Sequence, residues 1–357
     1  MKKLIALLLA LVMVLGLVAC GKTDAPVADA PADAPADKPA DAPADAPADA
    51  PAAEKPVIAF VPKVIGQAWW DYVGEGVAEW AAEHPEVEVI YKGPAEVDAA
   101  AQVQIMTDLV NQGVDALLFS PNDPNACEEI CKQAKEAGIV VISTEAATMT
   151  NVHFDVEAFN DAGLGAFLMD ELAKQMGEEG EYITMVGSMT MESHNNWADA
   201  AVARQQEAYP NMTLVADARV SSESDSEVAY NLVKQMKQKY PNLKGILGTS
   251  SFDAPGSARA IEELGLTGQM FAISVAMPSE TRDYLKAGVL EGVGLWDPAV
   301  TAKCMLNLAV DMLAGAEVAT GYDLGMPGYE SVEVTGTLIV GDGALAITAE
   351  NVDSFTF

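Results

Sequence analysis

The sequence predicts an α/β protein built from two successive lobes, each a Rossmann-like, doubly wound parallel sheet. Short runs of β-branched and aliphatic residues alternate with amphipathic segments along most of the chain, which is typical of parallel βαβ units. The alternation starts again after the apolar run Ile139–Ser143. Roughly 300 residues follow residue 56, more than a single core usually organises. Two halves are therefore expected.

The first 20 residues have the layout of a secretory signal peptide. Lys2 and Lys3 form a positive start, an apolar stretch runs over residues 4–18, and Ala19 precedes Cys20. The apolar stretch is too short for an ordinary spanning helix. A plain signal peptide or a signal anchor is the alternative. The segment 17–20 resembles a bacterial lipobox, which implies that Cys20 is lipidated and anchors the mature chain on the extracytoplasmic face of the cell membrane.

Residues 21–56 are predicted to form a disordered linker. An Asp-Ala-Pro-Ala unit repeats from Asp29 to Pro51. Proline at this frequency removes amide donors and prevents helix formation, and the aspartates repel one another. The segment therefore acts as a spacer between the anchor and the folded part.

The chain is strongly acidic, with a formal net charge of −33. Such a surface repels nucleic acid and anionic membrane and does not attract phosphorylated substrates. Contact with the membrane is therefore expected only through the lipid anchor.

The two halves are predicted as follows. In the first half, strands are expected at 57–61, 87–91, 116–119 and 139–143, and helices between them, reaching Trp80 and covering 99–112 and 126–137. In the second half, helices are expected at 163–175, 197–208, 227–238, 254–264 and 281–287, and strands at 182–186, 213–216, 245–248, 270–274 and 292–296.

Ligands of doubly wound sheets meet the carboxyl ends of the strands, so candidate site residues are sought there. In the first half these are Lys63, Trp69, Trp70, Asn122 and Glu145. Indole faces bind the CH-rich faces of sugars, and a few polar groups set the ligand's orientation. The alternatives are two core tryptophans and, for Asn122, helix capping or loop solvation.

The second half offers a polar loop with Ser193, His194 and Asn195, and a second loop with Thr249 and Ser251. A capping loop with one solvated histidine is the alternative for the first. Trp296 and Asp297 stand before a proline, where the chain recrosses between the halves, although a simple strand terminator explains them equally.

Several motifs together resemble a known family. They are the run Val57–Gly66, the pair Gly93-Pro94, the run Gln104–Asp115, and the segments Asn195-Asn196-Trp197, Gly294–Asp297 and Asn351–Phe357. They resemble the autoinducer-2-binding and rhamnose-binding branch of the type I periplasmic sugar-binding proteins. The resemblance implies the type I periplasmic binding fold, with two lobes joined by a three-crossing hinge. The implied lobes are 57–157 with 295–327, and 158–294 with 328–357.

The resemblance also assigns roles to residues. Lys63 matches a lysine that touches ligand in the autoinducer-2 receptors, and Glu145 takes the place of their aspartate. Ser193-His194, Thr249 and Ser251 depart from that branch. These departures favour a rhamnose- or pentose-like monosaccharide at least as much as autoinducer-2.

The resemblance implies a monomeric, extracytoplasmic substrate-binding lipoprotein that closes on a sugar-like ligand and delivers it to an ABC permease. A ligand-sensing partner of a chemoreceptor or sensor kinase is the alternative. No hydrolase elbow, phosphate loop or complete dinucleotide fingerprint appears, so no enzyme activity and no cofactor are expected. The histidines are too dispersed for a metal site, and Cys127 and Cys131 are expected either as buried thiols or as a disulfide.

Overall fold

The computed structural model describes residues 55–215 and 219–357. The predicted signal peptide, Cys20 and the linker up to residue 54 lie outside this part of the chain. Within it, no helix combines the length and the apolar character needed to cross a membrane.

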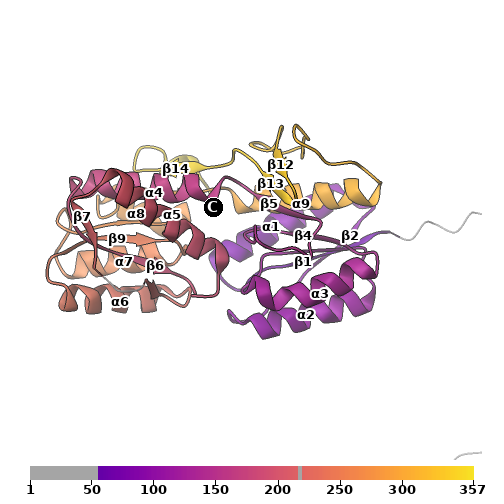
Figure 1. The fold of residues 1–357 in the computed structure, drawn as a ribbon, viewed down its shortest axis with the longest axis horizontal. Helices are drawn as coiled ribbons and strands as arrows, with labels where there is room; N and C mark the ends of the chain where they lie inside the picture. Colours follow the sequence, from indigo (N-terminus) through magenta and orange to yellow (C-terminus); the bar gives the residue numbers. More distant parts are fainter. Residues whose placement is uncertain (1–54, 216–218) are drawn as a thin grey trace, which may run out of the picture. The chain divides into compact units, whose positions relative to one another are not determined.

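The first lobe contains a seven-stranded sheet in the order β12-β13-β5-β4-β3-β1-β2, parallel except for β12 (Figure 1). Its elements are β1 (Val57–Val61), α1 (Ala68–Glu83), β2 (Glu88–Tyr91), α2 (Ala99–Gln112), β3 (Ala116–Phe119), α3 (Pro124–Glu136), β4 (Val140–Ser143), β5 (Phe154–Glu157), α9 (Pro298–Leu313), β12 (Glu333–Thr335) and β13 (Leu338–Val340).

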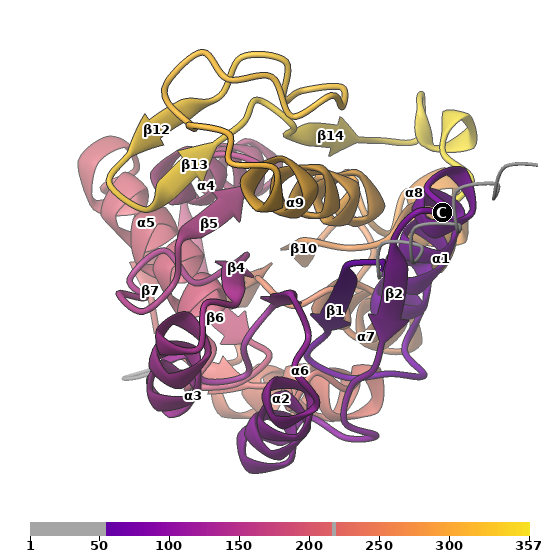
Figure 2. The same cartoon turned by 90° about the vertical axis from the view of Figure 1, so that its right-hand side faces the viewer.

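Helices cover both faces of this sheet, which explains why its central strands are apolar at nearly every position. Leu117 and Phe119 face a core formed with α2 and α3. Phe60 and Leu118 point the other way, into a core formed with α1 and α9. Figure 2 shows α2 and α3 below the strands and α9 above them. Cys127 and Cys131 are free thiols buried on the α3 side.

The second lobe has a five-stranded parallel sheet in the order β10-β9-β6-β7, with β8 pairing along the same edge of β6 as β7. Its elements are α4 (Asp161–Met176), β6 (Gly180–Val186), α5 (Glu192–Ala208), β7 (Met212–Leu214), β8 (Val220–Ser221), α6 (Ser226–Lys239), β9 (Leu243–Gly248), α7 (Asp253–Glu263), β10 (Phe271–Ile273) and α8 (Pro278–Lys286). A two-stranded antiparallel sheet joins β11 (Val293–Leu295) to β14 (Leu345–Ile347), and the 3-10 helix η1 (Val352–Ser354) follows.

The chain passes between the lobes three times: from β5 to α4, from β11 to α9, and from β13 to β14. The predicted boundary of the last crossing is wrong. The resemblance places residues 328–340 in the second lobe, but β13 pairs in parallel with β5, Leu338 opposite Asp155, and so extends the first sheet. The third crossing therefore follows Val340.

The strands and helices expected from periodicity are present, with boundaries that differ by a few residues. The strand expected at 213–216 is described only to Leu214. Five short strands were not predicted: β5, β8, β12, β13 and β14. They span two to four residues each, too few for an alternating pattern to stand out.

Candidate functional site

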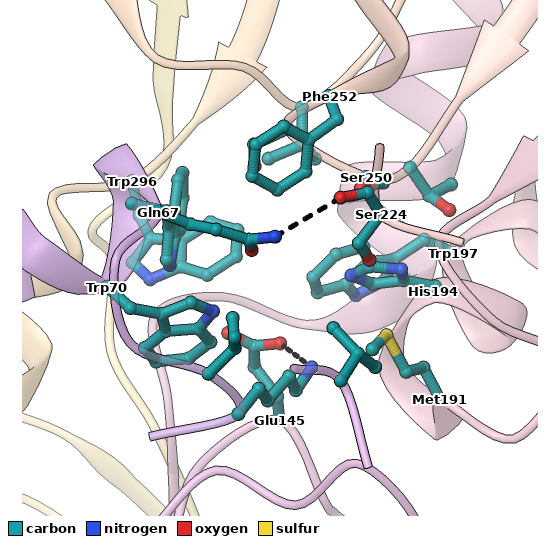
Figure 3. Close-up of a pocket in the computed structure, with 17 residues that line it drawn as sticks. Gln67, Trp70, Glu145, Met191, His194, Trp197, Ser224, Ser250, Phe252 and Trp296 are labelled. Carbon is teal, nitrogen blue, oxygen red and sulfur yellow. Dashed lines mark hydrogen bonds and ion pairs between the residues drawn. The ribbon is translucent and has the colours of Figure 1, made fainter. Parts of the chain in front are cut away.

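A cavity of about 30 Å³ lies between the lobes, at the carboxyl ends of several strands (Figure 3). Both lobes contribute to its wall. The lining residues are Lys63, Val64, Gln67, Trp69, Trp70, Val97 and Glu145 from the first lobe, Met191, His194, Trp197, Ser224, Thr249, Ser250, Ser251, Phe252 and Val275 from the second, and Trp296 from a crossing.

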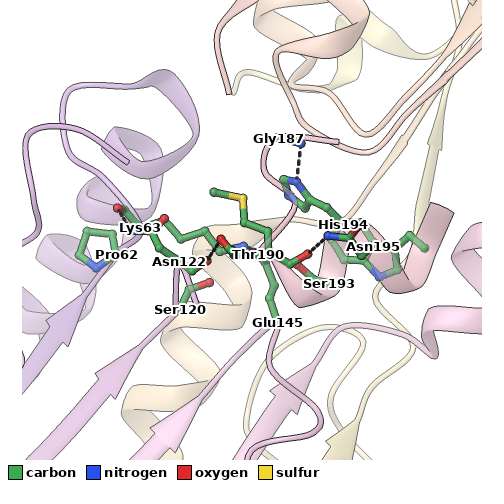
Figure 4. Close-up of polar contacts among 12 residues, drawn as sticks. Pro62, Lys63, Ser120, Asn122, Glu145, Gly187, Thr190, Ser193, His194 and Asn195 are labelled. Carbon is green, nitrogen blue, oxygen red and sulfur yellow. Dashed lines mark hydrogen bonds and ion pairs between the residues drawn. The ribbon is translucent and has the colours of Figure 1, made fainter. Parts of the chain in front are cut away.

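A buried ion pair forms the floor of the cavity. The Lys63 Nζ lies 2.5 Å from Glu145 Oε2, and the two residues are 3% and 6% exposed. Ser193 reaches across from the second lobe and donates a hydrogen bond to the same Glu145 oxygen at 3.2 Å (Figure 4). Because a buried charge is costly without a partner, the ammonium and the carboxylate each depend on the other.

Two cavity residues hold strained backbone conformations, one in each lobe. Glu145 has φ 58° and Ser224 has φ 51°, in the left-handed region that side chains with a Cβ seldom occupy. Such strain persists only where the surrounding structure enforces it, and it concentrates at functional sites. The Ser224 carbonyl accepts a hydrogen bond of 3.4 Å from Gln67 Nε2 of the first lobe, which links the two sides of the cavity (Figure 3).

Aromatic rings form one wall. The ring of Trp296 lies edge-on to Trp69, with centroids 4.9 Å apart, and to Trp197, with centroids 5.5 Å apart. The Trp197 Nε1 donates to Asp161 at 2.7 Å, which fixes the indole in place. Burial raises the pKa of Asp161, against the lowering effect of this hydrogen bond and one from Asn196. Indoles from both lobes and a crossing therefore meet at the cavity.

His194 faces the cavity as a neutral ring. Its Nδ1 accepts a hydrogen bond from the backbone N–H of Gly187 at 3.1 Å, so the proton of the neutral imidazole resides on Nε2. Burial, and then the Lys63 charge, hold the pKa of His194 well below its usual value. A Cβ at Gly187 would approach the His194 ring to 2.9 Å and collide with the Ser224 hydroxyl, so only glycine fits there. His194 thus presents an uncharged N–H donor.

Eight of the predicted site residues line the cavity: Lys63, Trp69, Trp70, Glu145, His194, Thr249, Ser251 and Trp296. The Thr249 hydroxyl donates its proton to the Met185 carbonyl at 3.2 Å, so it can only accept a hydrogen bond from a ligand. Trp70 also packs in the apolar core, so this indole serves both purposes.

Asp297 and Asn195 were predicted in the site, but they do not line the cavity. Asp297 caps the first turn of α9 through two backbone N–H groups and accepts from the Tyr72 hydroxyl at 3.2 Å. Asn195 donates to the Met191 carbonyl at 2.7 Å and accepts from Arg219 at 2.8 Å. Each side chain thus bonds to backbone near the start of its own helix and to one side chain distant in the sequence.

Asn122 and Ser193 stand directly behind the lining. The Asn122 Nδ2 donates to the Lys63 carbonyl at 2.7 Å, and the backbone carbonyl of Asn122 accepts from the Thr190 hydroxyl of the second lobe at 3.3 Å (Figure 4). Ser193 contacts the ion pair as described above. These two residues hold the charged pair and the lobes in place.

Several lining residues are not among those that the sequence predicts. Gln67 was detectable, because it adjoins the tryptophan pair after the first strand. Ser224 follows β8, a strand of two residues with no recognisable pattern. Met191 and Phe252 are apolar residues at helix starts and Trp197 lies within α5, and only the tertiary arrangement turns them toward the cavity.

The chemistry of the wall suits a neutral molecule rich in hydroxyls. Lys63 and Glu145 carry the only formal charges among the described lining residues, and these charges cancel. The ammonium and the His194 N–H donate, the carboxylate accepts, and serine hydroxyls do both. In the same described part of the chain, no group of three or more His, Cys, Asp or Glu side chains could hold a metal ion.

Comparisons with known proteins agree with this geometry. Residues 58–317 match the family described as the periplasmic binding protein domain. The chain is 25% identical over 272 residues to the D-ribose/D-allose-binding protein of Pseudomonas aeruginosa. The matched region covers 73% of this chain and 83% of that protein.

Two solved structures share the fold. LsrB from Clostridium saccharobutylicum in complex with AI-2 superposes with a TM-score of 0.77 at 23% identity, over 84% of this chain and 100% of that one. An ABC transporter solute-binding protein from Clostridium phytofermentas with bound L-rhamnose superposes with a TM-score of 0.76 at 19% identity, over 84% of this chain and 98% of that one.

Proposed function

Because the chain belongs to the periplasmic binding protein domain family, we propose that it is an extracytoplasmic solute-binding protein of an ABC importer, which captures a neutral monosaccharide between its lobes. One observation carries the proposal. The cavity shared by the two lobes combines a self-neutralised ion pair, Lys63 with Glu145, with indole faces and uncharged hydrogen-bonding groups.

The ligand class follows from this combination. A free sugar carries no charge, so it does not disturb the balance of the Lys63–Glu145 pair. Its hydroxyl groups match the mixed donors and acceptors, and its CH faces match Trp69 and Trp296. The names of the relatives support this class, since one binds D-ribose or D-allose and another holds L-rhamnose. AI-2, held by LsrB, is the competing ligand.

Binding requires the lobes to separate. A cavity of about 30 Å³ has room for about two water molecules, far less than a monosaccharide needs. The lobes touch through hydrogen bonds that must break first, among them Ser193 to Glu145, Gln67 to Ser224, and Thr190 to Asn122. A sugar that replaces these contacts shifts the equilibrium by its differential affinity for the two arrangements.

The N-terminal sequence supports a lipid anchor at Cys20, with residues 21–56 as a spacer. Delivery to an ABC permease fits this placement. A sensing role uses the same binding domain, and neighbouring genes distinguish the two: permease and ATPase genes favour transport, and a lone sensor kinase favours sensing.

Titration calorimetry against D-ribose, D-allose, L-rhamnose, D-xylose and AI-2 tests the proposal. At least one sugar should bind with a Kd in the micromolar range or below and be recovered unchanged. AI-2 should bind at least tenfold more weakly, a difference of about 1.4 kcal/mol. X-ray scattering should show a smaller radius of gyration when the protein is saturated with the sugar. Tight AI-2 binding without a response to any sugar would refute the proposed ligand class.

A further inference from the structure

Gln102 is a fully buried glutamine on α2 that lies beneath two loops of the proposed binding site. Its Nε2 donates to the carbonyls of Pro62, at 3.0 Å, and Ser120, at 2.8 Å. Its Oε1 accepts from the backbone N–H of Asn122 at 2.8 Å. Two acceptors on one side and a donor on the other determine which way the amide points, because the flipped amide would set its oxygen against two carbonyls.

These partners belong to the loops that follow β1 and β3, neighbouring parallel strands whose ladder ends at Val61 and Phe119. Beyond that point the two loops no longer pair with each other through the ladder. The Gln102 amide takes the place of the missing ladder bonds and satisfies backbone groups that would otherwise be buried without partners.

The first of these loops carries Lys63, the residue after Pro62. Asn122 in the second loop ties the two together, since its side chain donates to the Lys63 carbonyl at 2.7 Å (Figure 4). The backbone carbonyl of Asn122 accepts a hydrogen bond from the Thr190 hydroxyl of the second lobe. A single buried amide therefore holds the backbone that aims the Lys63 ammonium at Glu145 and the backbone that meets the opposite lobe.

We propose that Gln102 is a positioning residue for ligand binding, which keeps the Lys63 and Asn122 loops in the geometry that both the ion pair and the lobe contact require. It does not line the cavity, so it acts through Lys63 and Asn122. This inference rests on the proposed function.

The second lobe supplies a matched control. Gln205 on α5 is also buried and makes three hydrogen bonds: Nε2 donates to the backbone carbonyls of Tyr209 and Met212, at 2.9 and 3.0 Å, and Oε1 accepts from the Tyr182 side-chain hydroxyl at 3.1 Å. None of these partners lines the cavity. Replacing either glutamine by methionine removes a comparable amide from a comparable environment.

The experiment compares Gln102→Met with Gln205→Met at a temperature where circular dichroism shows both fully folded. Calorimetry uses whichever of D-ribose, D-allose and L-rhamnose binds the wild type most tightly. Gln102→Met should weaken binding at least tenfold, and Gln205→Met less than twofold. Equal losses in both variants, or no loss in Gln102→Met, would overturn the positioning role.

A third variant, Gln102→Glu, provides a pH profile that general destabilisation does not predict. Its ionised carboxylate can still accept from Asn122 but cannot donate to either carbonyl, whereas the protonated acid can donate to one. Affinity relative to the wild type should therefore recover as the pH falls from 8 to 5.5, and the relative affinity of Gln102→Met should stay constant. Parallel profiles for the two variants would contradict the proposal.

Amide hydrogen exchange without ligand separates this proposal from the proposed function. The Asn122 N–H should exchange at least tenfold faster in Gln102→Met and at an unchanged rate in Gln205→Met. If none of D-ribose, D-allose, L-rhamnose and D-xylose binds the wild type, the sugar-binding proposal fails. Unchanged Asn122 exchange in Gln102→Met refutes the positioning role in either case.

Discussion

Ser193 of the second lobe donates a hydrogen bond to Glu145 of the first lobe at 3.2 Å, and the accepting oxygen is the one that lies 2.5 Å from the Lys63 ammonium. One carboxylate oxygen thus serves two purposes. It neutralises a buried cation, and it joins the two lobes where the cavity closes.

Replacing Glu145 by glutamine should weaken sugar binding at least tenfold, or about 1.4 kcal/mol. The amide keeps the shape of the side chain but leaves the Lys63 ammonium buried without a counter-charge, which costs more than an ordinary lost hydrogen bond. Calorimetry measures the effect. Ser193→Ala removes a contact between the lobes that a bound sugar replaces, so it should not weaken sugar binding. Unchanged sugar affinity in Glu145→Gln would remove this carboxylate from the site.

The C-terminal residue should help to hold the lobes together. The Phe357 ring stacks on Tyr72 of α1, with centroids 4.7 Å apart, while its carbonyl accepts from the Ser279 N–H of α8 at 2.9 Å. The tail therefore connects a second-lobe helix to a first-lobe helix. Because an aromatic pair contributes about 0.5–1.5 kcal/mol, Phe357→Ala should lower sugar affinity by about two- to tenfold, mainly through faster dissociation.

Stopped-flow tryptophan fluorescence measures that dissociation rate. Tyr72→Phe serves as the control, because it keeps the stacked ring and loses only the hydroxyl contact with Asp297. A dissociation rate for Phe357→Ala equal to that of the wild type would show that the stack does not stabilise the closed arrangement.

The stability of the native state should depend on the protonation of Asp253. Its buried carboxylate accepts from the N–H groups of Thr249 and Ser250 at 3.1 and 3.0 Å. Burial raises the pKa of Asp253 to about 6, against the lowering effect of its hydrogen bonds. The folded protein thus holds this proton more tightly than the unfolded chain, where the pKa is about 3.9. The contribution is complete below about pH 4 and is lost as the pH rises to about 6.

Asp253→Asn removes this titration and retains an oxygen that can accept from the two N–H groups. Urea denaturation of both proteins should show the unfolding free energy of the variant rising relative to the wild type by up to about 1.4 kcal/mol per pH unit between pH 4 and 6. Above pH 7 the difference should level off. A difference that is constant across the whole range would exclude Asp253 as the titrating group.

Cys20 should anchor the mature chain. Cys20→Ser removes the thiol that the lipobox-like segment marks for lipidation, so the protein should leave the membrane fraction. Fractionation and labelling with a fatty-acid analogue measure the change. Full retention of the variant in the membrane fraction would disprove lipid anchoring.

Much of the fold could be predicted from the sequence, because both sheets are covered on both faces and their central strands are short apolar runs separated by amphipathic helices. The predicted type I periplasmic binding fold is confirmed. The strands of two to four residues, β5, β8, β12, β13 and β14, escaped prediction. The segment β13 is a strand because β5 offers it an open edge, and that neighbour lies about 180 residues earlier in the chain.

Some residues of the site could be predicted from the sequence and others could not. Residues that follow a recognisable strand, such as Lys63, Glu145 and His194, could be located because parallel strands all end at one edge of a sheet. Asn195 and Asp297 occupy similar places in the sequence, yet they bond to nearby backbone instead. The direction of a short polar side chain depends on which donors and acceptors surround it, and the local sequence does not determine that.

The two-lobed α/β architecture and the sheet edges where a ligand would bind could be predicted from hydrophobic periodicity, because periodicity is a local property of the chain. The contacts between side chains of different lobes depend on the tertiary structure. The Lys63–Glu145 pair, the Ser193 contact and the Gln102 amide each join residues separated by many positions. Their geometry arises from the packing of helices on sheets and of one lobe against the other, because contact at such separations is a property of the folded chain as a whole.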